Sequence, residues 1–282
     1  MFARGRSGEW QRTNTVRPYD IISKDGDHMK MYHIALTENQ VGKYAILTGD
    51  PGRVEHIAQY LDNPEFCASN REYTSWAGYI GGEKVNVTSV GIGGPSMAIG
   101  VEELFKLGCR NFIRIGTCGG ISLDVKAGDI VIANAAVRQE GTGCEYLPLS
   151  YPAVSDFGIS LALKTAVQSC RANGDYHIGV VQSKDSFYGE MEPERMPIKE
   201  YLQNLWAVYK RSGVLASEME CASLFLTAAS LGAKAGAVLL SIWNEERRKE
   251  LGDDTEFHDT DVMYKIAIQA IGDLIKTASN RQ

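Results

Sequence analysis

Two predicted strands carry residues that could bind an anion. One strand ends in a glycine-rich turn, and the other contains a buried arginine. The apolar run over residues 44–48 ends in Gly49-Asp50-Pro51-Gly52-Arg53, where Asp50 is suited to cap a helix and Pro51 to begin it. Arg114 interrupts the apolar run over residues 111–116, and a buried guanidinium requires a negatively charged partner. Backbone amides and guanidinium groups are typical ligands of phosphate. The two segments therefore indicate an anion site, although a salt bridge to a carboxylate of the protein would also explain Arg114.

A third glycine-rich turn, Ser89-Val90-Gly91-Ile92-Gly93-Gly94-Pro95-Ser96, leads from a predicted strand over residues 84–90 into a predicted helix. A strand, a glycine turn and a helix start can form an anion or nucleotide site, but a tight structural connection is the favoured explanation of the turn when it is taken alone. Ser96 stands where the dinucleotide-binding fingerprint has its third glycine, and no acidic residue follows at the expected strand end. The string is therefore not that fingerprint.

Two carboxylates flank one methionine in Ser217-Glu218-Met219-Glu220-Cys221, just before a helical run over residues 222–231. The helix dipole favours acidic residues at the start of a helix. A carboxylate can also accept hydrogen bonds from the hydroxyl groups of a sugar. The residues alone leave both interpretations open.

Composition and charge argue against several classes of protein. The chain has 282 residues and is 44% hydrophobic, which suits a globular α/β protein. Its formal net charge of −6 and the lack of a long run of one charge sign argue against nucleic-acid binding, and no apolar run is long enough to span a bilayer. The six cysteines and five histidines show no metal-ligand spacing. We therefore expect free thiols, no zinc site and a reducing, cytoplasmic location.

Strands and helices alternate along the chain, with hairpins between some strands, and this pattern predicts one α/β domain with a mixed sheet over residues 31–282. Residues 244–250 are expected to be irregular, and residues 1–30 to be a poorly ordered N-terminal extension or a leader added for expression. Strands are expected over residues 44–48, 66–69, 72–80, 84–90, 111–116, 129–133, 176–182 and 233–243, and helices over residues 54–61, 97–105, 156–172, 222–231 and 262–274.

These segments together resemble the nucleoside phosphorylase-I family, and within it the uridine phosphorylases. The resemblance covers roughly residues 31–278, and its blocks come in the family's order at compatible spacing. A set of five blocks is far more specific than any one of them. The matching blocks are Gly49-Asp50-Pro51-x-Arg53, Arg71-Glu72-Tyr73, the turn from Ser89 to Ser96 with its following helix, Arg114-Ile115-Gly116-Thr117 and Glu218-Met219-Glu220.

The resemblance implies a three-layer α/β/α fold of the phosphorylase/hydrolase kind and a role for each matching position. The positions implied for phosphate are Gly49, Arg53, Arg71, Arg114 and Thr117. Those implied for ribose are His33, Glu218, Met219 and Glu220, and those for the base are Phe187, Glu190 and Arg195. Those implied for a monovalent cation such as K⁺ between subunits are Glu72, Ile92 and Ser96. His33 and Arg71 would reach in from a neighbouring subunit, so the resemblance implies a homo-oligomer, a hexamer built from dimers that share active sites.

The chemistry that the resemblance implies is phosphorolysis of a nucleoside to the free base and ribose 1-phosphate, as in nucleoside salvage by a pentosyltransferase. Inorganic phosphate is the co-substrate and no cofactor is expected. Phosphate beneath C1′ would stabilise an oxocarbenium-like transition state and attack it, with Arg114, Thr117 and Glu220 as the catalytic residues. Arg195 would neutralise the charge on the departing base.

Two positions bear on which base is used. Purine-handling relatives carry a Ser-Asp pair after the last strand, and the aspartate protonates the purine. The corresponding stretch here, Ser241-Ile242-Trp243-Asn244-Glu245, lacks the aspartate and favours a pyrimidine, uridine above all. Glu190, however, stands where the uridine phosphorylases have a glutamine, and a carboxylate can accept from N3–H but cannot donate to a carbonyl oxygen. Purine nucleoside phosphorolysis, hydrolysis of a thioadenosyl nucleoside and non-catalytic nucleoside binding are therefore the alternatives.

Overall fold

The computed structural model describes residues 2–4, 10–12, 30–170 and 175–280. Within the first thirty residues, the short strands β1 (Phe2–Arg4) and β2 (Trp10–Arg12) pair antiparallel. The rest of the extension expected over residues 1–30 lies almost wholly outside the described residues, so its expected lack of order stays a prediction.

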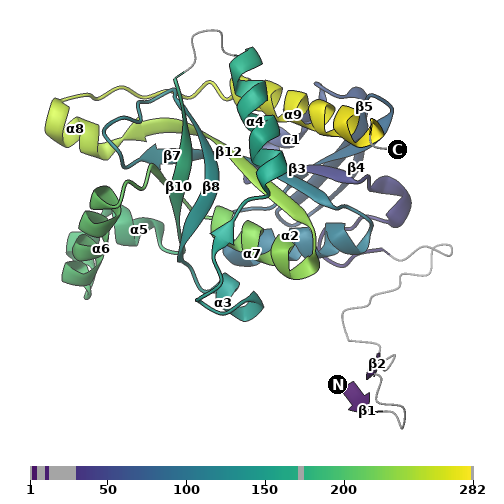
Figure 1. Ribbon diagram of the computed structural model, residues 1–282, viewed down its shortest axis with the longest axis horizontal. Helices are drawn as coiled ribbons and strands as arrows, with labels where there is room; N and C mark the ends of the chain where they lie inside the picture. The colour runs from purple at the N-terminus through teal and green to yellow at the C-terminus, as the bar shows by residue number, and fades with distance from the viewer. Residues whose placement is uncertain (1, 5–9, 13–29, 171–174, 281–282) are drawn as a thin grey trace.

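One mixed β-sheet runs through the protein (Figure 1). Its strand order is β11-β10-β8-β12-β7-β3-β6-β5-β4, with the short β9 paired to β8. β11 also pairs with β7, so five strands close into a ring at one end while the others continue as an open sheet. The strands are β3 (Tyr44–Thr48), β4 (Asp62–Asn70), β5 (Tyr73–Ile80), β6 (Glu83–Ser89), β7 (Asn111–Gly120), β8 (Ile130–Gln139), β9 (Ala153–Val154), β10 (Tyr176–Lys184), β11 (Ala216–Glu218) and β12 (Lys234–Asn244).

Helices cover both faces of this sheet and make three layers (Figure 1). Successive side chains of a strand point to opposite faces, so Ala45 and Leu47 of β3 enter the core beneath one set of helices, while Tyr44 and Ile46 enter the core beneath the other. The α/β fold with a mixed central sheet is therefore confirmed. The helices of the first face are α2 (Gly94–Lys106), α3 (Thr142–Tyr146) and α7 (Cys221–Leu231), and those of the second are α1 (Val54–Ala58), α4 (Phe157–Cys170) and α9 (Asp261–Ser279).

Local signals in the sequence correctly predict several connections. Asp50 caps the 3₁₀ turn η2 (Pro51–Arg53) by accepting a hydrogen bond of 2.8 Å from the Gly52 amide, and α1 follows directly. Gly81 and Gly82 join β5 to β6 with φ angles of 56° and 84°, a hairpin turn that favours glycine.

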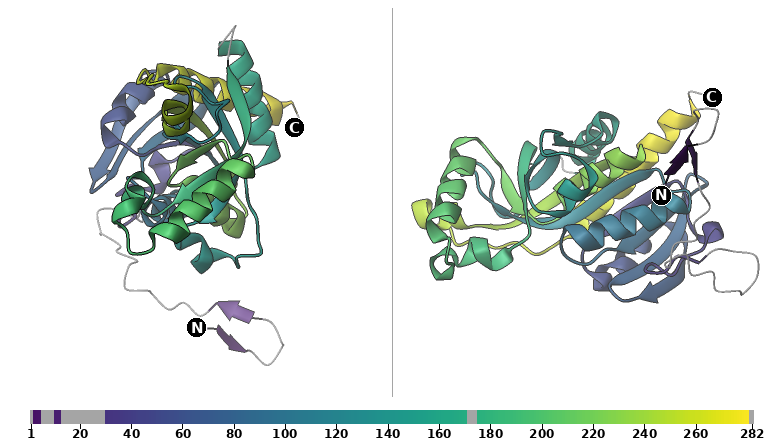
Figure 2. Two further views of the ribbon diagram at one scale, coloured as in Figure 1. Left: turned by 90° about the vertical axis from the view of Figure 1, so that its left-hand side faces the viewer. Right: turned by 90° about the horizontal axis from the view of Figure 1, so that it is seen from below.

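The end of the molecule opposite the C-terminus of α9 differs from the expectation (Figure 2). Residues 244–250 were expected to be irregular, but they form α8 (Glu245–Leu251), because the Asn244 side chain accepts hydrogen bonds of 3.0 Å from the amides of Glu246 and Arg247. The same end holds α5 (Phe187–Met191), the 3₁₀ turn η3 (Pro193–Arg195) and α6 (Lys199–Arg211), none of which has a counterpart in the expected helices.

In the described part of the chain, no helix combines the length and apolar character needed to cross a membrane. The six cysteines are free thiols, as expected.

Candidate active site

A cavity of about 690 Å³ opens where several strands end. Its walls come from the segments that follow β3 and β6 and from the carboxyl-terminal ends of β7, β10, β11 and β12. Crevices at the carboxyl ends of parallel strands are the usual ligand sites of α/β sheets. Ten of the residues expected from the sequence line it: Gly49, Arg53, Ile92, Arg114, Thr117, Phe187, Glu190, Glu218, Met219 and Glu220.

One corner of the cavity contains residues that suit an anion. Gly49 packs closely against the turn after β6, because a Cβ atom there would lie 3.2 Å from the Gly91 carbonyl oxygen. Arg53 follows in the capped turn, with its Nε 3.7 Å from the Asp50 carboxylate and about a third of its side chain exposed. Arg114 and Thr117 reach the same cavity from β7. The corner thus joins two guanidinium groups, a hydroxyl and a closely packed turn.

Arg114 also has the carboxylate partners that the alternative interpretation required. Its Nε lies 3.2 Å from Glu218 Oε2, and its Nη2 donates to Glu220 Oε2. Burial lowers the pKa of the Arg114 guanidinium, but Glu220 and Glu218 more than offset this effect and raise it above its usual value. Arg114 is therefore a permanent cation that the two carboxylates hold against the cavity wall.

Glu218 and Glu220 differ in their contacts, and only Glu218 fits the interpretation as an acidic residue at a helix start. Glu218 is fully buried and accepts hydrogen bonds from the backbone amides of Glu220, at 2.8 Å, and Cys221, at 3.0 Å, so it stabilises the start of α7. Glu220 instead joins Arg114 to the glycine turn, because its Oε1 accepts a hydrogen bond of 2.6 Å from the Gly93 amide. Burial is the main cause of a raised pKa for Glu220; Arg114 opposes the shift and Glu218 adds to it.

The same cavity holds a buried ion pair that the sequence analysis missed. Lys184, at the end of β10, places its Nζ 2.9 Å from Glu190 Oε2. Ser217 of β11 accepts a hydrogen bond of 2.5 Å from Lys184 and donates one of 2.6 Å to Glu190. The signal was a lysine directly before the loop that carries Phe187 and Glu190, but only the parallel pairing of β10 with β11 places Lys184 beside Ser217.

The other expected residues do not line this cavity. His33 binds Glu103, with Nδ1 2.7 Å from Oε1, and Arg71 lies over the Tyr32 ring at 5.7 Å. Because Tyr32 also packs edge-to-face on His33, at 4.7 Å between ring centres, His33 and Arg71 lie near each other.

Three further expected residues lie outside the cavity walls. Arg195 pairs with Glu192 and lies over the Tyr188 ring at 5.6 Å, with more than half of its side chain exposed. Ser96 donates hydrogen bonds of 3.2 Å to the carbonyl oxygens of Ile92 and Gly93. Glu72 lies beside Gly91, where a Cβ atom would be 3.0 Å from the Glu72 Cγ.

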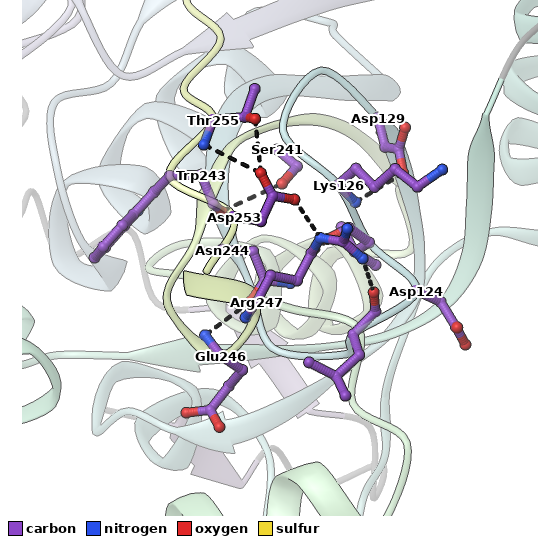
Figure 3. Close-up of polar contacts among 12 residues, drawn as sticks. Asp124, Lys126, Asp129, Ser241, Trp243, Asn244, Glu246, Arg247, Asp253 and Thr255 are labelled. Atoms are coloured by element: carbon purple, nitrogen blue, oxygen red, sulfur yellow. Dashed lines mark hydrogen bonds and ion pairs between the residues drawn. The ribbon is translucent and has the colours of Figure 1, made fainter. Parts of the chain in front are cut away.

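Asn244 is a structural residue behind the cavity wall (Figure 3). Its Nδ2 donates to the carbonyl oxygens of Ser122, at 2.7 Å, and Val125, at 2.8 Å, while its Oδ1 caps α8. The neighbouring Trp243 extends away from this cluster and lines the cavity. The amide of Asn244 is thus fully used in holding the loop after β7 against α8.

Arg247 strengthens the same junction (Figure 3). It donates to the Leu123 carbonyl oxygen at 2.5 Å and to Asp253 Oδ2 at 2.8 Å. Hydrogen bonds from Thr255 and Arg247 lower the pKa of Asp253 to about 2. The segment after α8 is therefore tied to the loop after β7.

A second cavity, of about 620 Å³, adjoins the first and shares Lys184, Glu190 and Trp243 with it. α6 and α8 border it, and Glu246 joins them by accepting from Trp206 Nε1 at 2.8 Å and from Lys210 Nζ at 2.5 Å. The part of the first cavity lined by Lys184, Glu190 and Trp243 therefore continues into a space that α6 and α8 border.

Comparisons with known proteins identify the family to which the chain belongs. The model of the phosphorylase superfamily matches residues 43–277. The uridine phosphorylase of Treponema pallidum is 45% identical over 89% of this chain and 96% of its own length, and that of Haemophilus influenzae is 43% identical over 78% and 88%. The guanosine phosphorylase of Halorubrum lacusprofundi is 37% identical over 80% of this chain and 89% of its own.

Proposed function

The chain belongs to the phosphorylase superfamily, and from this premise we propose that it catalyses the phosphorolysis of a pyrimidine nucleoside, uridine, to uracil and ribose 1-phosphate. The single observation that carries the proposal is the convergence of Arg53, Arg114, Thr117 and Glu220, from three separate segments, on one cavity. The uridine phosphorylases of other organisms, similar over most of this chain, support the choice of base. The reaction belongs to nucleoside salvage in the cytoplasm.

Phosphate would bind at the corner formed by Gly49, Arg53, Arg114 and Thr117. The arginines hold it beneath C1′, where it stabilises the positive charge of the transition state and forms the new bond. Glu220, which Arg114 and the Gly93 amide orient, would accept hydrogen bonds from the ribose hydroxyls beside Met219. Glu218 supports this arrangement from behind. Phosphate is a co-substrate, and the residues need no cofactor for this chemistry.

His33 and Arg71 would complete the site of a neighbouring subunit, the phosphate site through Arg71 and the ribose site through His33. Neither residue lines the cavity of its own chain, which fits this role, and the chain carries exposed apolar side chains for such a contact: Phe66 is 58% exposed and Ile92 is 76% exposed. Burying these side chains in a dimer would be favourable. Glu72, Ile92 and Ser96 would hold a K⁺ ion at the same contact.

A second exposed apolar group lies around β9 and α4 and would join dimers into a hexamer. Its members are Leu149, Tyr151, Val154, Phe157 and Leu161. Light scattering of the purified protein, followed by subunit mixing, tests both contacts. Mixing inactive Arg71→Ala with inactive Arg53→Ala protein should restore activity, because hybrid dimers contain one site with both arginines.

A nucleoside panel assayed for base release, with and without phosphate, tests the reaction. Release of uracil from uridine only with phosphate is expected. Release without phosphate would mean a hydrolase, and tight uridine binding by calorimetry without turnover would mean a binding protein. Deoxyuridine and thymidine in the same panel give the sugar and base preference.

Guanosine is the second candidate substrate, and Glu190 is the observation that favours it. A carboxylate accepts two N–H donors, and the N1–H and 2-amino groups of guanine present such a pair. Against it, the aspartate that protonates N7 in purine-handling relatives is absent from residues 241–245, and the Asn244 amide in this stretch is committed to Ser122 and Val125. Guanosine and inosine therefore belong in the same panel.

A further inference from the structure

The cavity contains one cation and one anion in direct contact beside Phe187, one of the residues expected to bind the base. Among the described residues, three cations line the 690 Å³ cavity: Arg53, Arg114 and Lys184, of which Lys184 lies beside Phe187 and Glu190. Lys184 is only 5% exposed and sits 2.9 Å from the Glu190 carboxylate. A buried lysine is stable only when such a partner offsets its charge.

The contacts of Lys184 leave it able to bind a ligand. A lysine ammonium carries three N–H donors and no acceptor. Its contacts with Glu190 and Ser217 use two of these donors. The ammonium also lies 5.9 Å from the centre of the Phe187 ring, which lines the same cavity. A third donor is thus left for a group bound beside Phe187.

Glu190 provides a hydrogen-bond acceptor next to the donor of Lys184. Its Oε2 atom is engaged by Lys184 and by the Ser217 hydroxyl. Its Oε1 atom can therefore accept a hydrogen bond from the ligand. Side by side, the two residues present one acceptor and one donor, whereas a carboxylate alone presents only acceptors.

We propose that Lys184 and Glu190 read the base together, and that Lys184 is the residue that stabilises the departing base. Glu190 accepts the imide N–H of uracil, and Lys184 donates to the adjacent carbonyl oxygen. Ser217 is a positioning residue that holds both side chains in place. The inference rests on the proposed phosphorolysis of uridine and names the residues that determine its base.

The bond changes explain why a cation is needed at this position. A phosphate oxygen forms a bond to C1′ while the bond from C1′ to the base nitrogen breaks, and the electron pair of that bond stays with the base. The base leaves as an anion whose charge is shared with its carbonyl oxygens, and it takes a proton from water after release. An ammonium placed at one of these oxygens binds the base more strongly in the transition state than in the substrate.

A change of leaving group tests this role. Fluorine withdraws electrons, so 5-fluorouracil is the more stable anion and depends less on Lys184. The variant Lys184→Met/Glu190→Gln removes both charges, so no unpaired ion is left buried, and its amide still carries a donor and an acceptor. We expect kcat to fall about 100-fold on uridine but only about tenfold on 5-fluorouridine, with KM changing within about threefold.

A matched pair in the adjoining cavity provides the control. Lys210 and Glu246 are 2.5 Å apart, and Lys210→Met/Glu246→Gln should lower stability without changing the ratio of the two kcat values. Lys184→Arg keeps the positive charge, so the ratio of kcat on uridine to kcat on 5-fluorouridine should stay within about threefold of the wild-type value. This variant provides a test if the double variant does not fold.

Equal losses on the two substrates in the folded double variant, or a shifted ratio in Lys184→Arg, would overturn the role of Lys184 while leaving the proposed function intact. If the wild-type protein releases no uracil in phosphate, the proposed function fails, and the role of Lys184 fails with it.

Discussion

Replacing Arg114 by alanine should damage both phosphate use and stability, because this guanidinium serves two functions. It lines the phosphate corner, and it is the counter-ion of two buried carboxylates, Glu218 and Glu220. Removing one partner of a buried ion pair costs about 3–5 kcal/mol. The value should lie near the lower end, because backbone amides still bind Glu218 and the Gly93 amide still binds Glu220.

The loss of stability in Arg114→Ala should depend on pH, and the direction of this dependence identifies its cause. The pKa of Glu220 is already raised by burial, and without Arg114 nothing as strong opposes that effect. A carboxylate whose pKa is higher in the folded than in the unfolded protein binds more protons when folded, so stability falls as pH rises between the two pKa values. The stability deficit of Arg114→Ala should therefore be small in mild acid and largest at neutral pH.

Urea unfolding between pH 5 and 8, together with phosphate-dependent uracil release, measures both effects. Arg53→Ala is the matched control, because Arg53 lines the same corner but is partly exposed, and its contact with Asp50 is 3.7 Å long. It should lose phosphate affinity while its stability changes by less than about 1 kcal/mol. Should Arg114→Ala keep wild-type stability at neutral pH, or activity within a few-fold, the dual role of Arg114 would be wrong.

Three other substitutions test the supports of the site. Asn244→Asp keeps the cap of α8 but cannot donate to Ser122 and Val125, so it should cost about 2–4 kcal/mol in urea unfolding and should not create inosine phosphorolysis. Burial raises the pKa of Glu246, but hydrogen bonds from Lys210 and Trp206 outweigh this effect and lower it. Glu246→Gln should therefore cost about 1–3 kcal/mol of stability at pH 7, and less as pH falls below the usual carboxyl pKa of 4.5. Gly49→Ala places a methyl group 3.2 Å from the Gly91 carbonyl oxygen and should raise the KM for phosphate roughly tenfold, with little change for uridine.

Elements whose signals are local were predictable. The turn at Gly49 follows from Asp50 as a cap and Pro51 as a helix start, and the β5–β6 hairpin follows from two adjacent glycines. Residues 244–250 were wrongly expected to be irregular because they are rich in charge. Their helix depends on Asn244, whose side chain is held by loop residues about 120 positions away in the sequence.

From the sequence alone we could predict most strands of the sheet, the longer helices that pack on it other than α6, and the types of residue available for an anion and a sugar, because periodicity, caps and turns act over a few residues. Only the tertiary structure decided which of these residues meet. The Gly93 amide binds Glu220 across 127 positions, and Lys184 contacts Ser217 because β10 and β11 pair in parallel. The order of strands in the sheet determines such meetings, and no local pattern encodes it. For the same reason, the sequence could mark Glu190 as an unusual residue at the base, but only the fold supplied the lysine that neutralises it.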